Sequence, residues 1–166
     1  MTGSRALPLT DEPRAGARPL VAAAVLVALL LPVVAAHAQL EASVPAANAA
    51  VAEPVTAVAL TFTEGVEAAF STFKVYRIDG TVDVADDHAA MRLNALAAVL
   101  VTSYAGSQGD GAGKVEAELA PAADEAVVTL TFAEPLEPGH YVVMWRLLSA
   151  DTHVVDGHLV FTVVGR

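Results

Sequence analysis

Hydrophobic and polar residues alternate along most of the chain after residue 38. A period of two is typical of strands that bury one face and expose the other. The alternation predicts short strands at residues 39–44, 58–62, 73–78, 81–85, 115–119, 127–132, 141–147 and 159–163. Pro, Gly, Asn and Asp separate them, and Asp79-Gly80 favours a tight hairpin. About seven strands of this kind, with almost no convincing helix, predict an all-β protein built as a two-sheet sandwich.

Residues 86–113 depart from the alternation. Residues 88–101 are rich in Ala and Leu, with Met91, Leu96, Val99 and Leu100 at helical spacing, and residues 103–113 are rich in Gly, Ser and Asp. This composition fits a short helix, or a strand followed by a mobile loop, and the pattern leaves both open. We treat 86–113 as an irregular insertion in one domain that spans residues 37–166.

Residues 1–36 form a separate segment. Three arginines precede an almost wholly apolar run at residues 20–34, and two alanines follow it. A basic start, an apolar stretch and small residues at a cleavage point are typical of a secretory signal peptide. A membrane anchor needs roughly 20 apolar residues, and the shorter run here is interrupted by Pro32. We therefore expect a signal peptide at 1–36 and a mature protein without a stable membrane anchor.

Net charge and cysteine content exclude several classes of function. The full chain has a net charge of −10, and removal of residues 1–36 leaves 6 basic and 17 acidic residues, hence −11. Such an acidic domain lacks the basic surface that nucleic acids require, whereas it suits a cationic partner or a metal ion. Since the chain has no cysteine, disulfides, thiolate metal sites and thiol catalysis are excluded.

Candidate metal ligands lie in a polar turn after the 141–147 strand, where Asp151 and His153 are separated by one residue. If the signal peptide is cut after Ala36, His37 becomes the first residue, and its free amine and imidazole can chelate one ion. The amine has an unperturbed pKa near 8, so a strongly bound ion displaces its proton easily. Together with His153 this gives three nitrogens, plus the Asp151 carboxylate, and tetragonal nitrogen and oxygen ligands favour Cu(II).

Two alternatives to this ligand set remain open. An Asp-x-His pair in a turn is often only a hydrogen-bonded turn. Cleavage after Ala38 is also compatible with the sequence and would remove His37.

Three segments resemble the CopC family of periplasmic copper-resistance proteins. They are residues 134–163 (EPLEPGHYVVMWRLLSADTHVVDGHLVFTV), the opening 35–46 (AAHAQLEASVPA) and 58–64 (VALTFTE). The resemblance implies a Greek-key β-sandwich or barrel of cupredoxin or immunoglobulin type that binds Cu(II) and is not an enzyme. It implies His37, Asp151 and His153 as ligands, with Glu64 as a weak ligand or a neighbour of the ligands.

The resemblance further implies that this protein sequesters or transfers copper in the periplasm, for resistance or homeostasis. Its partners would be the copper ion and a membrane copper permease of the CopD type, or other periplasmic copper carriers. Thr152 and Val154 depart from the family pattern, which has glycine and proline there. Because only Met91 and Met144 remain in the mature chain, we expect no methionine-rich Cu(I) site.

Two other function classes are kept as alternatives: a metal-free sandwich for adhesion or chaperoning, and a copper oxidase of polysaccharides with a histidine brace. The other candidate residues receive structural interpretations. His88 is expected in a solvated loop, His140 toward solvent and His158 at a surface or rim. Tyr141 and Trp145 are expected in the core, and Arg146 is expected to pair with a carboxylate that the sequence does not identify.

Overall fold

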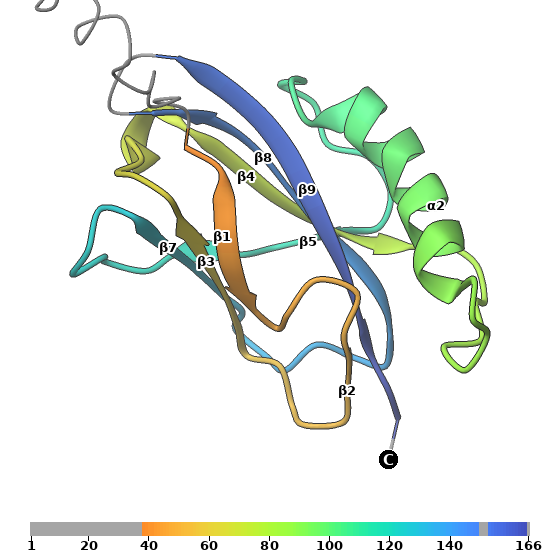
Figure 1. Cartoon of the computed structure of the whole chain (residues 1–166). Coiled ribbons are helices and arrows are strands. Elements are labelled where there is room, and N and C mark those ends of the chain that lie inside the picture. Colours follow the sequence, from red (N-terminus) through yellow and green to blue (C-terminus); the bar gives the residue numbers. More distant parts are fainter. Residues whose placement is uncertain (1–37, 150–152, 166) are drawn as a thin grey trace, which may run out of the picture. The chain divides into compact units, whose positions relative to one another are not determined.

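The computed structural model describes residues 38–149 and 153–165, and within them two β-sheets pack face to face (Figure 1). The four-stranded sheet has the order β1 (Leu40–Val44), β3 (Ala57–Phe62), β7 (Val127–Thr131), β6 (Glu118–Leu119). The five-stranded sheet has the order β2 (Ala50–Val51), β9 (Val154–Val163), β8 (Gly139–Leu148), β4 (Thr72–Ile78), β5 (Lys114–Val115). Most neighbouring strands are not consecutive in sequence, as in a Greek key. The predicted all-β sandwich is confirmed.

The core between the sheets follows from the alternation. Every second residue of β3 is buried, and the same holds for the inward side chains of β7, β8 and β9. Burying one large aliphatic or aromatic side chain stabilises the fold by roughly 1.5–3 kcal/mol. The main contributors are Val58, Leu60, Phe62, Val128, Leu130, Tyr141, Val143, Trp145, Leu147, Leu159 and Phe161. Tyr141 and Trp145 are therefore core residues, as predicted.

A helix replaces most of the predicted irregular insertion. α2 (Ala89–Tyr104) lies against the outer face of the five-stranded sheet (Figure 1). Leu93 and Ala97 of α2 pack with Tyr76, Val142 and Met144 of the sheet in a second hydrophobic core. β4 and β8 are consequently buried on both faces over much of their length, which explains why residues 140–145 are buried without alternation. No helix in the described residues is long and apolar enough to cross a membrane.

The strand predicted at residues 81–85 is wrong, because aspartates fold this stretch into turns. The Asp83 carboxylate accepts the backbone N–H of Ala85 at 2.9 Å, and the Asp86 carboxylate accepts that of His88 at 2.8 Å. Short polar side chains that bond nearby backbone groups compete with strand pairing in this way. The exposed His88 lies beside Asp86 in the turn before α2, as expected for a loop residue.

The single strand predicted at residues 115–119 is divided between the two sheets. β5 pairs with β4 in the five-stranded sheet, whereas β6 pairs with β7 in the four-stranded sheet. The chain therefore crosses from one sheet to the other at Glu116 and Ala117, a change of layer that the alternation does not reveal.

The Gly-rich segment after α2 is tied to the sheet by one lysine. Lys74 is only 9% exposed and donates hydrogen bonds to the carbonyl oxygens of Ser107, at 2.9 Å, and Gly109, at 3.0 Å. It also pairs with Asp110 at 3.2 Å. Hydrogen bonds from Lys114 and Lys74 hold the pKa of the Asp110 carboxyl below its usual range. The segment is thus fixed by its polar contacts to β4.

His140 is buried, so the expectation that it faces solvent is wrong. Its side chain is 9% exposed and lies on the outer face of β8, beneath the segment that leads into α2. The backbone N–H of Val82 donates to Nε2 at 3.2 Å, so Nδ1 carries the proton and donates to Thr162 Oγ1 at 2.9 Å. The neutral imidazole therefore connects β9 to the turn before α2.

Between about pH 7.5 and about pH 5.5, the free energy of unfolding is expected to fall less steeply in His140→Gln than in the wild type. Burial lowers the pKa of His140 below its usual range. The stability that neutral His140 contributes is therefore fully present above the unfolded pKa of about 6.5 and is lost as the pH falls through the folded pKa. Urea unfolding at several pH values measures the slope.

The matched control is His88→Gln, at an exposed position, which should leave the slope unchanged. Part of the slope should survive in His140→Gln, because burial also lowers the pKa of the half-buried His158. Equal slopes in wild type and His140→Gln would contradict the assignment.

Candidate metal centre

Two of the four predicted metal-site residues, Glu64 and His153, belong to the described part of the chain, whereas His37 and Asp151 lie outside it. No group of three or more His, Cys, Asp or Glu side chains suited to a metal ion occurs within residues 38–149 and 153–165. The structure does establish how the described segments that flank the predicted ligands are arranged. The start of β1, the end of β8 and the start of β9 lie at the same end of the sandwich (Figure 1).

The first described residues are fixed next to Glu64. The backbone N–H of Thr63 donates to the carbonyl oxygen of Gln39 at 2.9 Å, and the N–H of Gln39 donates to Thr63 Oγ1 at 3.0 Å. Ala38 is fully buried in the core between the sheets. The chain therefore enters the fold beside the residue that precedes Glu64.

The end of β8 reaches the other side of the same segment. Ser149 forms an isolated antiparallel bridge with Val66, and the N–H of Glu67 donates to the carbonyl oxygen of Leu148 at 2.9 Å. Leu148 in turn donates its N–H to Ser71 Oγ at 3.0 Å, just after the 3-10 helix η1 (Ala68–Phe70). Residues 63–67 thus lie between the start of the described chain and the end of β8.

Ser149 also holds the residue that begins the return into β9. Its backbone N–H and its hydroxyl both donate to the carbonyl oxygen of His153, at 2.9 and 3.1 Å, and Ser149 itself is fully buried. The backbone of His153 is therefore anchored while its side chain is exposed. The return of the chain into β9 therefore starts from a fixed backbone position at His153.

Glu64 carries a buried oxygen without a partner. Its Oε1 is inaccessible to solvent and has no hydrogen-bond partner among the described residues. An unsatisfied buried acceptor destabilises a fold by about 1–3 kcal/mol, and more when it is charged. A cation near this carboxylate would remove that penalty.

The core beneath this end of the sandwich is closely packed. Trp145 and Leu147 of β8 are 4% and 1% exposed, and the Trp145 ring meets Phe62 edge to face at 5.7 Å between centroids. Arg146, on the opposite face of β8, pairs with Asp156 at 3.1 Å, which identifies the carboxylate that the sequence left open. The segments around Glu64 and His153 are therefore attached to a well-packed layer.

Sequence reasoning missed the residues that bring these segments together. Thr63, Ser71 and Ser149 are hydroxyl residues at strand or turn ends, which is a general sign of side-chain bonds to backbone groups. Each also bonds or pairs with a segment tens of residues away (Thr63 with Gln39, Ser71 with Leu148 and Ser149 with Val66), and the sequence alone could not pair these segments. His158 is half-buried on β9 rather than fully exposed, consistent with the predicted rim position.

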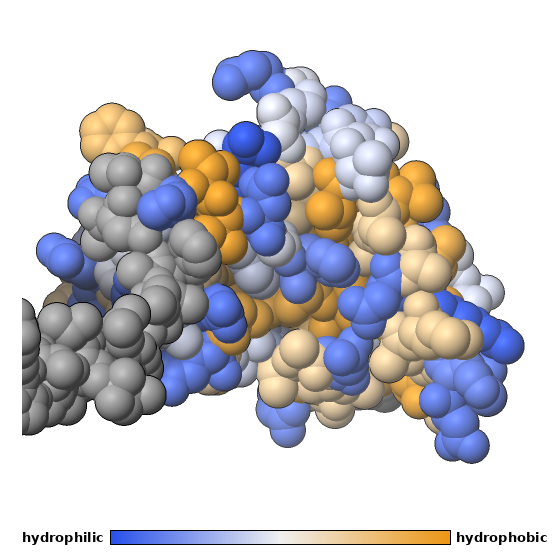
Figure 2. Space-filling model, turned by 45° about the horizontal axis from the view of Figure 1, so that its top comes forward, coloured by the Kyte–Doolittle hydropathy of each residue, from blue (hydrophilic) through white to orange (hydrophobic). Residues whose placement is uncertain are grey.

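The described surface that faces the viewer in Figure 2 is chemically mixed. With the top of Figure 1 turned forward, hydrophilic and hydrophobic side chains are interspersed (Figure 2). The chain has nine aromatic residues, all within its described part, and of these only Phe70, at 77%, is largely exposed. A flat aromatic platform of the kind that stacks against sugars is not among the described features.

Comparison with known proteins identifies the family to which the chain is similar. The chain matches the family model of the CopC domain over residues 40–106 and 90–164. Copper resistance protein C of Escherichia coli is 32% identical over 128 residues, which are 77% of this chain and 82% of that protein.

Two solved structures are similar. PcoC, a methionine-rich copper resistance protein from Escherichia coli, has a TM-score of 0.53 and 30% identity, covering 77% of this chain and 99% of that chain. CopC from Methylosinus trichosporium OB3b has a TM-score of 0.54 and 27% identity, covering 78% of this chain and 96% of that chain. The family model extends over both sheets and α2, and this protein belongs to the CopC family.

Proposed function

We propose that the protein binds Cu(II) and sequesters or transfers it in copper resistance or homeostasis. The observation that carries this proposal is the buried Oε1 of Glu64, which has no hydrogen-bond partner among the described residues and lies on the segment that contacts both Gln39 and Ser149. Membership in a family whose relatives include copper resistance proteins supports copper as the cation.

The proposed ligands are the amine and imidazole of His37, the Asp151 carboxylate and the His153 imidazole. His37 precedes Ala38 and Gln39, which are fixed beside Thr63, and Asp151 falls between Ser149 and His153, whose backbones are bonded to each other. Nitrogen and oxygen ligands of this kind favour Cu(II) among the common divalent ions. Glu64 balances the charge of the ion or orients a ligand imidazole from nearby.

This assignment requires processing and export. A signal peptide at residues 1–36 would deliver the protein to the periplasm and leave His37 as the first residue. The partners that would supply or receive the ion are a membrane copper permease of the CopD type or other periplasmic copper carriers. The role is binding rather than catalysis, since Phe70 is the only largely exposed aromatic side chain among the described residues, and a polysaccharide oxidase would need several to stack against sugars.

Copper titration of the secreted protein tests the proposal. We expect one tight Cu(II) complex with visible d–d absorption, and its loss in His153→Ala. Glu64→Gln keeps the side-chain shape, removes the charge and should weaken binding by about 10–100-fold, as for groups just outside the ligand set. The matched control is Glu67→Gln, at an exposed carboxylate three residues away, which should have no effect.

Absence of a tight complex, or an unchanged complex in His153→Ala, would contradict the proposal and favour a metal-free sandwich used in adhesion or chaperoning. Oxidation of a polysaccharide by the copper-loaded protein in the presence of ascorbate would instead favour the oxidase.

A further inference from the structure

The outer face of α2 is exposed and apolar. One face of the helix packs on the five-stranded sheet, and an exposed stripe runs along the opposite face, made of Met91, Ala95, Ala98 and Thr102. Spacings of four, three and four residues place these side chains in one line along a helix. Met91 is 64% exposed, and Val99 beside the stripe is 67% exposed. A surface helix normally has charged and polar residues on its outer face, so an apolar outer face indicates a contact surface.

This face also lacks negative charge. The chain has 19 acidic residues, but residues 88–109 contain none, and this is the longest run without one in the described part of the chain. Arg92 is the one lysine or arginine in the run, and it pairs with Asp86 at 3.1 Å. Two copies of so acidic a domain repel each other wherever carboxylates meet. The stripe on α2 is a surface on which a second copy meets no opposing carboxylate.

The stripe is complementary to itself when two helices run antiparallel about a two-fold axis. This pairing places Met91 of each copy against Thr102 of the other, and Ala95 of each against Ala98 of the other. A large side chain then meets a small one at both ends, and the central alanines let the helix axes approach to about 8 Å. The Thr102 hydroxyl donates to the Ala98 carbonyl oxygen at 2.8 Å within the same helix, so it needs no partner across the contact.

The charges at the start of α2 favour the antiparallel direction. Asp86 and Asp87 directly precede the helix, which has 16 residues and is therefore about 24 Å long. An antiparallel pair holds the aspartates of the two copies at opposite ends, well beyond the screening length of about 8 Å at physiological salt. A parallel pair would bring them side by side. The helix dipoles also attract each other only when the helices are antiparallel.

A lipid surface suits this face less well. Helices that lie on membranes usually have lysines and arginines on the polar face and bulky aromatic side chains on the apolar face. α2 has one arginine, and its single aromatic residue, Tyr104, stacks on Tyr76 at 5.2 Å between ring centroids. The stripe therefore lacks the side chains that would insert into a membrane.

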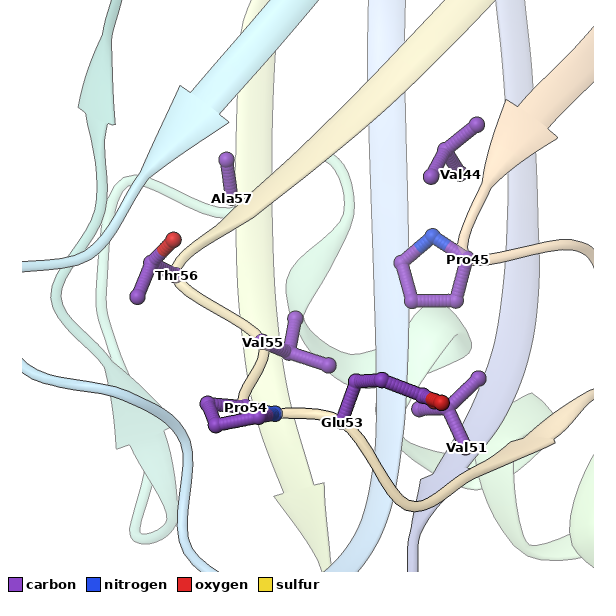
Figure 3. A pocket seen from close by; sticks show the side chains of 8 residues that line it. All are labelled: Val44, Pro45, Val51, Glu53, Pro54, Val55, Thr56 and Ala57. Atoms are coloured by element: carbon purple, nitrogen blue, oxygen red, sulfur yellow. The ribbon is translucent and has the colours of Figure 1, made fainter.

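The apolar hollow beside β1 suits a second copy less well than α2 does. Its apolar walls include Val44, Pro45, Val51 and Val55, but the Glu53 side chain also lines it (Figure 3). A two-fold contact centred on this hollow would bring the Glu53 carboxylates of the two copies toward each other. Like charges placed together across an interface oppose association.

We propose that the outer face of α2 binds α2 of a second copy in antiparallel direction and forms a two-fold symmetric homodimer. The contact is limited to one pair of helices, so it buries less than the roughly 800 Å2 per partner of a standard stable interface. The dimer is therefore weak and reversible, and it forms where the protein is concentrated. It uses none of the proposed copper ligands and goes beyond the proposed function.

Sedimentation velocity of the purified secreted protein tests the proposal, with EDTA present to prevent metal-bridged association. As the protein concentration rises, we expect a monomer–dimer equilibrium, with amide NMR shifts confined to α2 and the turns that flank it. Ala95→Glu should weaken the dimer by at least about 100-fold, because it buries a carboxylate near the two-fold axis. Ala95 is exposed in the monomer and glutamate favours helix, so the variant should unfold at the temperature of the wild type.

Two equally exposed valines provide a matched control. Val99→Glu, beside the stripe, should weaken the dimer by about 10-fold. Val44→Glu, at a position that is 70% exposed on β1 in the other sheet, should leave dimerisation unchanged.

Mixing two variants tests the antiparallel alignment. Ala95→Glu and Ala98→Lys occupy positions that oppose each other, so a mixture of the two proteins should form a heterodimer although Ala95→Glu alone stays monomeric. Rescue by Ala95→Lys and not by Ala98→Lys would mean that the helices are parallel, and would overturn the proposed alignment.

The proposed dimer is overturned if the wild type stays monomeric at every concentration, if the shifts lie outside α2 and its flanking turns, or if Ala95→Glu dimerises like the wild type. Vesicles of phosphatidylcholine and phosphatidylglycerol provide the remaining comparison. A monomeric wild type that binds these vesicles, with loss of binding in Ala95→Glu, would show that the occupant of the stripe is a lipid surface.

Discussion

One extra residue placed ahead of His37 in the mature protein is expected to weaken Cu(II) binding by at least about 100-fold. This exceeds the effect of losing a group that only supports a ligand, which is typically about 10–100-fold. The added residue converts the amine of His37 into an amide, which has lost the basic nitrogen that would chelate the ion together with the imidazole. Competition against a Cu(II) chelator of known affinity measures the change.

The control for this extension is one extra residue at the C-terminus, which should leave the affinity unchanged. The intact mass of the secreted protein must be measured alongside, because cleavage after Ala38 would produce a chain that starts at Gln39 and lacks the chelate. Equal affinity in the extended and unextended proteins would show that the His37 amine is not a ligand.

Gly157→Ala is expected to destabilise the fold by about 1–3 kcal/mol, the usual range for overpacking a core. A Cβ at this position would lie 2.5 Å from Cε2 and Cζ2 of Trp145 and 2.6 Å from its Nε1. The indole cannot move away easily, since Trp145 is 4% exposed and packs against Phe62. Chemical unfolding measures the loss.

A double-mutant cycle identifies the cause. Trp145→Phe removes the part of the indole that a Cβ would meet, so Gly157→Ala should cost less in that background than in wild type. Gly165→Ala is the control, because the nearest atom to its Cβ would be Pro138 Cγ, at an ordinary 3.6 Å. Strict additivity of the two substitutions would mean that the steric contact with Trp145 is not the cause.

The sequence predicts best those strands that bury one face. β3 and β7 alternate cleanly because their other face is toward solvent. The prediction failed at residues 81–85, where local bonds from Asp83 and Asp86 decide the backbone. It failed for His140 because the segment containing Val82 covers that face of β8, and this tertiary contact has no local signal.

For the candidate metal centre, residue types and spacing alone indicated His37, Asp151 and His153 as ligands, and the resemblance supplied Glu64. The way in which Thr63 and Ser149 connect segments distant in sequence depends on strand register. Register is fixed by the whole sheet, so it could not be derived from either segment. The roles of His37, Glu64, Asp151 and His153 are proposals, to be tested by copper titration.

The position of α2 has a consequence for the rate at which a copper ion at the proposed site could exchange. Because β4 and β8 lie between α2 and the inter-sheet core, their amides should exchange with solvent only in the rarest, most global opening events. Ser149 and the anchored backbone of His153 adjoin this slow layer. Copper capture and release at the proposed site would therefore depend on local motion of the exposed His153 side chain. A donor or acceptor protein could then take the ion without waiting for the sandwich to open.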